Sequence, residues 1–110
     1  MESNMEISFQ LILNAGNSKS NSLMAIEAAR EGDFEESEKL IKDAEVELTL
    51  AHQSQTNMIQ NEARGQHTEI DIILVHAQDH LTTAMLMIDQ AREFLSIYKM
   101  IYDLKEQIQK

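Results

Sequence analysis

The stretch that decides the fold runs from Ile70 to Tyr102 and reads IDIILVHAQDHLTTAMLMIDQAREFLSIYKMIY. Apolar residues recur along it at alternating intervals of four and three positions, the spacing that places side chains on one face of an α-helix. The members of this stripe are Ile70, Leu74, Ala77, Leu81, Ala84, Ile88, Ala91, Leu95, Tyr98 and Tyr102. The spacing predicts one helix over about residues 69–108, well beyond the roughly 8–20 residues usual in globular proteins.

A second helix is predicted upstream, over about residues 34–61. Gly32 stands where a helix C-cap is expected, and Asp33 follows as an N-cap with Glu36 three residues on. From there the same spacing continues through Phe34, Ser37, Ile41, Ala44, Leu48, Ala51, Gln55 and Met58. A polar link follows, in which Thr68 and Asp71 form a weaker cap pair ahead of the long helix.

The N-terminal segment predicts a further helix, over about residues 3–31, with a less regular pattern. Met5, Phe9, Ile12, Leu23 and Ile26 fit one stripe, but the run NAGNSKSNS over residues 14–22 has the composition of a loop. Propensity alone therefore divides this helix in two. Three helices with short links and no β-alternation predict an all-α fold, an antiparallel three-helix bundle in a single domain over residues 1–110.

Composition narrows the classes of function. The 110 residues carry 19 acidic and 9 basic side chains, and the net charge of −10 argues against binding to nucleic acid or to an anionic membrane. Cysteine is absent, which excludes disulfides, thiolate catalysis and cysteine zinc sites. Apolar runs such as residues 72–75 are far too short to span a membrane and no signal peptide opens the chain, so we expect a cytoplasmic protein without membrane insertion. The acidic residues gathered over positions 27–47 are interpreted as a solvated helix face.

The long helix is too apolar for a single buried stripe. Ile72, Val75 and Leu86 lie on the side away from it. A helix that is apolar nearly all round is buried nearly all round, which predicts self-association about a symmetry axis. Isolated apolar residues on the surface are the alternative. Asp79 stands on this second face, where its copies would repel one another near an axis and a hard divalent ion such as Mg²⁺ would relieve them; a solvated carboxylate is the alternative.

His76, Asp79 and His80 share one quadrant of the long helix. One fitting chemistry is a transition-metal pair with a carboxylate, as in a zinc or iron hydrolase, although the usual zinc motif has Glu where Ala77 stands. A second is an imidazole that accepts a phosphoryl group. Partly buried structural histidines, as in a non-enzymatic helical adaptor, are the third. His52 is interpreted as a boundary residue beside the stripe of the second helix.

The sequence VHAQDHL at residues 75–81 resembles the signature of the lactose/cellobiose-type enzyme IIA of the sugar phosphotransferase system. The stretches LILNAGN at 11–17, REGDF at 30–34 and AHQSQT at 51–56 resemble other segments of that family, so the likeness covers roughly residues 5–100. The run Leu81-Thr82-Thr83 departs from the family, in which many members carry Met after the Leu; it follows the key residues and leaves them intact.

The resemblance implies a subunit of three helices, unbroken through residues 14–22, in a nine-helix homotrimer. It implies phosphorylation of His76 on Nε2, with the histidine-containing phosphocarrier protein as the phosphoryl donor and a cysteine of the cognate enzyme IIB as the acceptor. Asp79 matches the position that binds one metal ion per trimer on the axis, expected to be Mg²⁺. Supporting roles are expected for His80, Gln78 and His52. The sugar would be a disaccharide of the lactose, cellobiose or chitobiose class.

The charge around a transferred phosphoryl group is a further expectation. The N–H groups inside a helix are already bonded to carbonyls, so His76 gains no anion site from its own helix end. With only 9 basic residues in the chain, we expect much of the positive charge to come from basic partner surfaces that dock beside His76.

Overall fold

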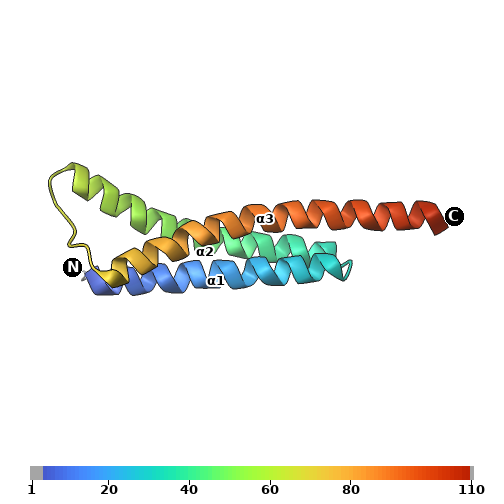
Figure 1. Ribbon diagram of the computed structural model, residues 1–110, viewed down its shortest axis with the longest axis horizontal. Coiled ribbons are helices and arrows are strands. Elements are labelled where there is room, and N and C mark those ends of the chain that lie inside the picture. The colour runs from blue at the N-terminus through green and yellow to red at the C-terminus, as the bar shows by residue number, and fades with distance from the viewer. Residues whose placement is uncertain (1–3, 110) are drawn as a thin grey trace.

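The computed structural model describes residues 4–109, and within that range it consists of three α-helices: α1 (Asn4–Arg30), α2 (Phe34–Ala63) and α3 (Ile72–Gln109). Successive helices run antiparallel along a molecule 65 Å long and 20 Å wide (Figure 1). The predicted all-α three-helix bundle is confirmed; residue 3, the expected start of the first helix, lies outside the described residues. No helix among residues 4–109 is long and apolar enough to cross a membrane.

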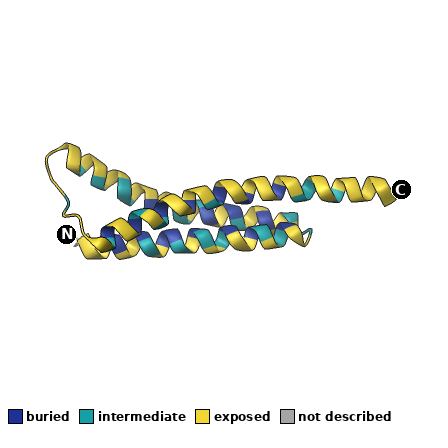
Figure 2. Cartoon of the chain, viewed as in Figure 1, coloured by how far each residue is buried: buried dark blue, intermediate teal, exposed yellow. Residues whose placement is uncertain are grey.

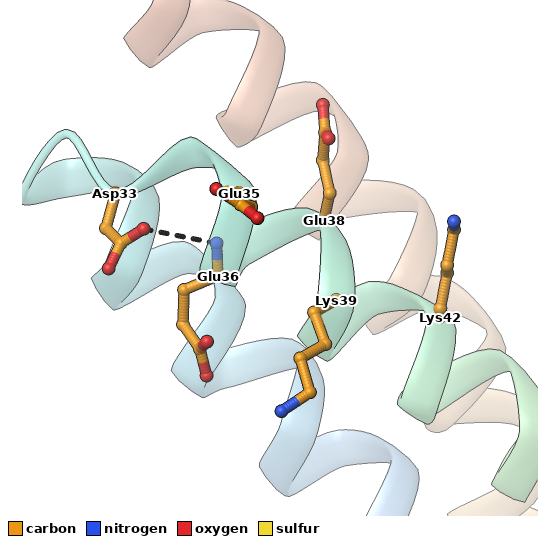
Figure 3. A pocket seen from close by; sticks show the side chains of 6 residues that line it. All are labelled: Asp33, Glu35, Glu36, Glu38, Lys39 and Lys42. Carbon is orange, nitrogen blue, oxygen red and sulfur yellow. Dashed lines mark hydrogen bonds between the residues drawn. The ribbon is translucent and has the colours of Figure 1, made fainter.

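The turn between α1 and α2 has the caps that the sequence predicts. The N–H of Asp33 donates to the carbonyl of Ala28 at 2.9 Å, and that of Gly32 donates to Ala29 at 3.0 Å, the paired bonds of a Schellman motif. Gly32 takes the positive φ of 84° that this motif requires. Asp33 then accepts a hydrogen bond from the N–H of Glu36 at 3.2 Å, as Figure 3 shows, and begins α2.

α1 is unbroken through residues 14–22, and the face that it buries is made mostly of small side chains. The buried residues are Ser8, Leu11, Asn14, Ala15, Ser18, Ser22, Ala25 and Ala29. The Ser18 hydroxyl donates to the carbonyl of Ala44 at 2.9 Å, and the Ser37 hydroxyl of α2 donates to Ala25 at 2.8 Å. Small residues let the two backbones approach closely, and the hydroxyls satisfy their polar groups across the contact.

The apolar stripe predicted for α1 is therefore wrong at its largest members. Met5, Phe9 and Leu23 are exposed, whereas Ile12 and Ile26 are half-buried. The physical reason is that α1 lies in close contact with both other helices, so alanine and serine fill the interface and bulkier side chains are displaced to its edges.

The stripes predicted for α2 and α3 are confirmed with one exception. Every member of the α2 stripe is buried or half-buried, and so is the α3 stripe from Leu74 to Tyr102. Figure 2 shows these buried positions along the facing sides of the helices, with the C-terminal end of α3 largely exposed. The exception is Ile70, which lies in the link at 78% exposure.

The link between α2 and α3 spans residues 64–71, later in the chain than the 62–68 that the predicted helices leave. Gly65 ends α2 with a φ of 87°, and α3 begins only at Ile72. Asp71 caps α3, because its carboxylate accepts a hydrogen bond of 2.8 Å from the N–H of Leu74. The cap proposed at Thr68 is wrong, since the N–H of Thr68 instead donates to the Glu62 carboxylate at 3.3 Å and holds the link against α2.

The acidic residues over positions 27–47 face solvent, apart from Glu45 and Glu47, which are half-buried. Several of them surround a shallow depression of about 500 Å³ on the first turns of α2, where their side chains splay outward (Figure 3). Glu38 forms an ion pair with Lys99 of α3 at 2.8 Å, and Glu45 forms one with Arg92. The interpretation as a solvated face is confirmed.

Candidate functional site

His76 and His80 lie one turn apart near the N-terminal end of α3. The rotation of α3 about its axis is fixed by Ala77 and Leu81, which are fully buried in one cluster with Leu11 of α1 and Ala51 of α2. With those residues inward, His76 is exposed and His80 is half-buried beside α1. The core packing therefore presents one imidazole to solvent and supports it with another.

The two histidines form a chain of contacts with a lysine of α1. Nε2 of His80 lies 3.1 Å from Nε2 of His76, and the rings meet edge to face with centroids 4.5 Å apart. On the other side of the same ring, Nδ1 of His80 lies 2.9 Å from Nζ of Lys19. The Lys19 ammonium group of α1 thus contacts the His80 ring, and the His80 ring contacts the exposed His76 ring on the surface of α3.

These groups line an open cavity of about 230 Å³. Its walls are formed by Lys19, His76, Asp79, His80 and Thr83. The Thr83 hydroxyl donates to the backbone carbonyl of Asp79 at 2.9 Å, so it is tied to the helix. The cavity has room for a small anionic group beside His76, with the lysine cation on one wall.

The environment lowers the pKa of the His80 imidazole below its ordinary value. Burial between α1 and α3 is the largest cause, and the positive charges of Lys19 and of a protonated His76 act in the same direction. The Asp79 carboxylate opposes them. His80 is therefore neutral at physiological pH and carries a single ring N–H.

Lys19 and Thr83 are the cavity residues that sequence reasoning missed. Lys19 belongs to the run 14–22, which has a loop composition, so the sequence does not show on which helix face its side chain lies. The available signal was that Lys19 is the first basic residue of the chain, with no other before Arg30. The expectation that much of the positive charge comes from partner surfaces stays a prediction, and one cation is supplied by this chain's own α1.

Two of the other candidate residues, Gln78 and His52, are not brought to the cavity. Gln78 is half-buried, and its side-chain oxygen accepts a hydrogen bond of 2.6 Å from Gln55 of α2. Gln78 thereby lines a separate, mainly apolar groove of about 320 Å³, where the end of α2 diverges from α3. His52 is exposed on α2 and is not among the residues that line the cavity around His76. Asp79 contributes to that cavity from its exposed side.

Metal binding by one chain alone has no support in the geometry. Among residues 4–109 there is no group of three or more His, Asp or Glu side chains arranged to hold an ion. His76, Asp79 and His80 therefore lack the convergent geometry that a hydrolytic zinc or iron centre needs. A hard ion at Asp79 would require carboxylates from more than one copy of the chain.

Comparison with known proteins finds close relatives along nearly the whole chain. The family model described as "PTS system, Lactose/Cellobiose specific IIA subunit" matches residues 6–99. The lichenan-specific phosphotransferase enzyme IIA component of Bacillus subtilis is 49% identical over 96 residues, which cover 87% of this chain and 87% of the relative.

Solved structures of other enzyme IIA proteins have the same fold. The cellobiose-specific enzyme IIA from Bacillus anthracis superposes with a TM-score of 0.88 and 41% identity, covering 94% of this chain and 95% of that one. The IIA(chitobiose)–HPr complex of the Escherichia coli phosphotransferase system contains a chain with a TM-score of 0.80 and 29% identity, covering 93% of this chain and 99% of that one.

Proposed function

The chain belongs to the family of lactose/cellobiose-specific IIA subunits of the phosphotransferase system, and we propose that it carries the phosphoryl group on Nε2 of His76. The observation that carries the proposal is the setting of that imidazole. His76 is exposed at a cavity whose walls include a lysine cation and a second imidazole 3.1 Å away. An exposed nucleophile beside hydrogen-bond donors and positive charge is what phosphoryl transfer requires.

In the proposed reaction the chain takes part in two transfers. Nε2 of His76 attacks the phosphorus of a phosphohistidine on the donor, so a nitrogen–phosphorus bond forms at His76 as the donor imidazole leaves with its electron pair. A cysteine thiolate of the cognate enzyme IIB then attacks the same phosphorus, and His76 leaves. Both steps depend on in-line positioning and charge neutralisation more than on acid–base chemistry.

The proposed phosphoryl donor is HPr, the histidine-containing phosphocarrier protein. Support comes from the Escherichia coli neighbour, whose structure is that of a complex of a chitobiose IIA protein with HPr. The net charge of −10 favours partners with basic docking surfaces, which would meet the exposed side of α3 around His76. The sugar would be a disaccharide of the lactose, cellobiose or chitobiose class.

We propose that three copies assemble through α3. The second apolar face of α3 is exposed in the single chain: Ile72 at 86%, Val75 at 50% and Leu86 at 57%. The face continues toward the C-terminus, where exposed apolar residues include Ile97, Met100, Ile101, Leu104 and Ile108. So long an apolar surface on one helix is typical of an interface between helices of separate chains, and burying it in a trimer would give nine helices in all.

The Mg²⁺ site is proposed at Asp79 on the trimer axis. Asp79 is exposed between Val75 and Leu86, so its carboxylate would be brought together with its copies by the same interface. Three carboxylates provide the oxygen ligands that a hard divalent ion prefers, and the ion would neutralise their repulsion. Its role would be in assembly, and phosphoryl transfer at His76 does not pass through it.

The test is phosphorylation by a donor mixture of phosphoenolpyruvate, enzyme I and HPr, followed by mass mapping. We expect one acid-labile phosphoryl group per chain, on His76, and none on His76→Gln. The matched control is His67→Gln in the exposed link, which should accept phosphate as the unaltered chain does. A chain that takes up no phosphate would favour the helical adaptor, and a His76→Gln chain that is still labelled would overturn the assignment to His76.

A further inference from the structure

We propose that Lys19 is a positioning residue that fixes the tautomer of His80 and, through it, keeps Nε2 of His76 unprotonated at the cavity. The inference rests on the proposed role of His76 as the phosphoryl carrier. It assigns a part in that role to a residue of α1, which the sequence motif on α3 does not contain.

The contact with Lys19 determines which ring nitrogen of His80 carries the proton. A lysine ammonium group has three hydrogen-bond donors and no acceptor. The contact of 2.9 Å between Nζ of Lys19 and Nδ1 of His80 therefore requires Nδ1 to accept, which leaves that nitrogen without a proton. A neutral imidazole carries one N–H, so the proton of His80 lies on Nε2.

The tautomer of His80 in turn determines the tautomer of His76. Nε2 of His80 lies 3.1 Å from Nε2 of His76, and only one of the two nitrogens donates in that contact. Because His80 has its proton on Nε2, it donates, and Nε2 of His76 accepts with its lone pair. His76 then carries its own proton on Nδ1, which is the tautomer that can attack phosphorus through Nε2.

The hydrogen bond between His80 and His76 is replaced when a phosphoryl group arrives on His76. The new bond uses the lone pair of His76 Nε2, so the N–H of His80 is released to donate to a phosphoryl oxygen. His80 keeps its proton on Nε2 in this exchange, because Lys19 still donates to Nδ1 and that nitrogen cannot take up the proton. The lysine charge on the cavity wall also offsets the incoming negative charge.

The position of Lys19 is held by its neighbour in the chain. Ser18 is fully buried, and its hydroxyl donates to the carbonyl of Ala44 on α2 at 2.9 Å. This bond fixes the axial position and the rotation of α1 relative to α2 at the residue before Lys19. The lysine side chain then reaches the boundary between α1 and α3 where His80 is half-buried.

The test measures tautomers and rates separately. In the unphosphorylated chain labelled with ¹⁵N-histidine, at about pH 8, we expect the N–H on Nε2 of His80 and on Nδ1 of His76. Lys19→Met should convert His80 to a mixture of tautomers and slow phosphoryl transfer from phosphorylated HPr about tenfold. Lys19→Arg keeps a cationic donor and should restore both, whereas Lys39→Met, an exposed lysine on α2, should change neither.

Failure of the inference and failure of the proposed function are distinguishable. If the unaltered chain carries its phosphate elsewhere than His76, the proposed function is wrong, while the tautomer of His80 still decides the claim about Lys19. A His80 ring with its proton on Nδ1, or a Lys19→Met chain with unchanged tautomers or an unchanged rate, would overturn the role of Lys19.

Discussion

The hydroxyl of Tyr102, far along α3, donates a hydrogen bond of 2.9 Å to the carbonyl of Arg30, the last residue of α1. The tyrosine ring also packs edge-on against Phe34 at the start of α2, with centroids 5.4 Å apart. One side chain thus joins the end of α1 and the beginning of α2 to the exposed half of α3. The turn at Gly32 lies directly beneath that ring.

This contact predicts that Gly32→Ala is destabilising. A Cβ at position 32 would approach the Tyr102 ring to 2.9 Å, and the positive φ is unfavourable for any L side chain. We expect the free energy of unfolding to decrease by about 1–3 kcal/mol, the usual cost of such backbone strain, in urea or thermal denaturation followed by circular dichroism.

Gly16→Ala is the matched control for the glycine effect. Gly16 lies inside α1, and a Cβ there would meet nothing within 4 Å. Alanine has the higher helix propensity, so this variant should gain about 0.5–1 kcal/mol of stability. If both variants lose stability to the same extent, the contact with Tyr102 does not explain the requirement for glycine at position 32.

Two buried serines of α1 should differ in how their stability responds to removal of the hydroxyl. Ser18→Ala loses a buried hydrogen bond to Ala44 and should lower the free energy of unfolding by about 1 kcal/mol. The Ser22 hydroxyl is buried and, among the described residues, is the one side-chain polar atom of this kind without a hydrogen-bond partner. Ser22→Ala removes a desolvated polar group and should be neutral or stabilising.

The same denaturation assay checks this pair, because both substitutions delete one oxygen atom from the same buried face. A loss of stability in Ser22→Ala as large as that in Ser18→Ala would show that the Ser22 hydroxyl is satisfied in the folded chain. It would also contradict the assignment of the difference to the bond with Ala44.

These serines also show which parts of the fold a sequence can predict. Local signals identified α2 and α3, because Asp33 caps its own helix and the apolar stripes face a single core. α1 was harder, since its buried face is mostly alanine and serine and hydropathy does not distinguish such a face from a loop. The identity of that face depends on helix-to-helix distance, which is a property of the packed bundle.

The candidate site, too, contains residues that the sequence identifies and residues that only the packing of the helices brings together. His76 and His80 were recognisable because they lie one turn apart on a single helix. Lys19 lies 61 positions from His80 in the chain, and only the packing of α1 against α3 brings the two side chains together. The sequence predicts Thr68 as the cap with Asp71 as its partner three residues on, but Asp71 is the cap, because the Glu62 carboxylate holds Thr68 in the link.

The ion pair between Glu38 and Lys99 predicts a specific titration. The hydrogen bond from Lys99 and its positive charge hold the pKa of the Glu38 carboxyl below its ordinary value. A depressed pKa means that the pair stabilises the fold above the unfolded pKa of glutamate, and that this contribution is lost as the pH decreases through the lower folded value. Lys99→Met should therefore raise the pKa of Glu38, as measured by carboxyl ¹³C shifts.

Lys105→Met is the control for this titration. Lys105 also belongs to α3, but its ammonium lies 5.5 Å from the centroid of the Tyr102 ring. Its removal should leave the pKa of Glu38 unchanged. The assignment would be contradicted by a Glu38 carboxyl that titrates at its ordinary value in the unaltered chain, or by equal shifts in the two variants.

The proposed axial carboxylate leads to a prediction about assembly. Asp79→Leu replaces three mutually repelling charges with apolar groups on a face that already exposes Val75 and Leu86. We expect a trimer at least as stable as that of the unaltered chain, without bound Mg²⁺ and without sensitivity to a chelator. Sedimentation velocity with and without EDTA, combined with metal analysis, measures both properties.

Asp43→Leu provides the matched control, because Asp43 is an exposed aspartate on α2, away from the proposed interface. That variant should keep the metal and the chelator sensitivity of the unaltered trimer. The phosphoryl acceptance of His76 should survive in Asp79→Leu as well, since the ion is assigned to assembly and Lys19 and His80 remain in place. A monomeric Asp79→Leu chain would mean that the carboxylate holds the copies together, and the axial repulsion on which this prediction depends would be wrong.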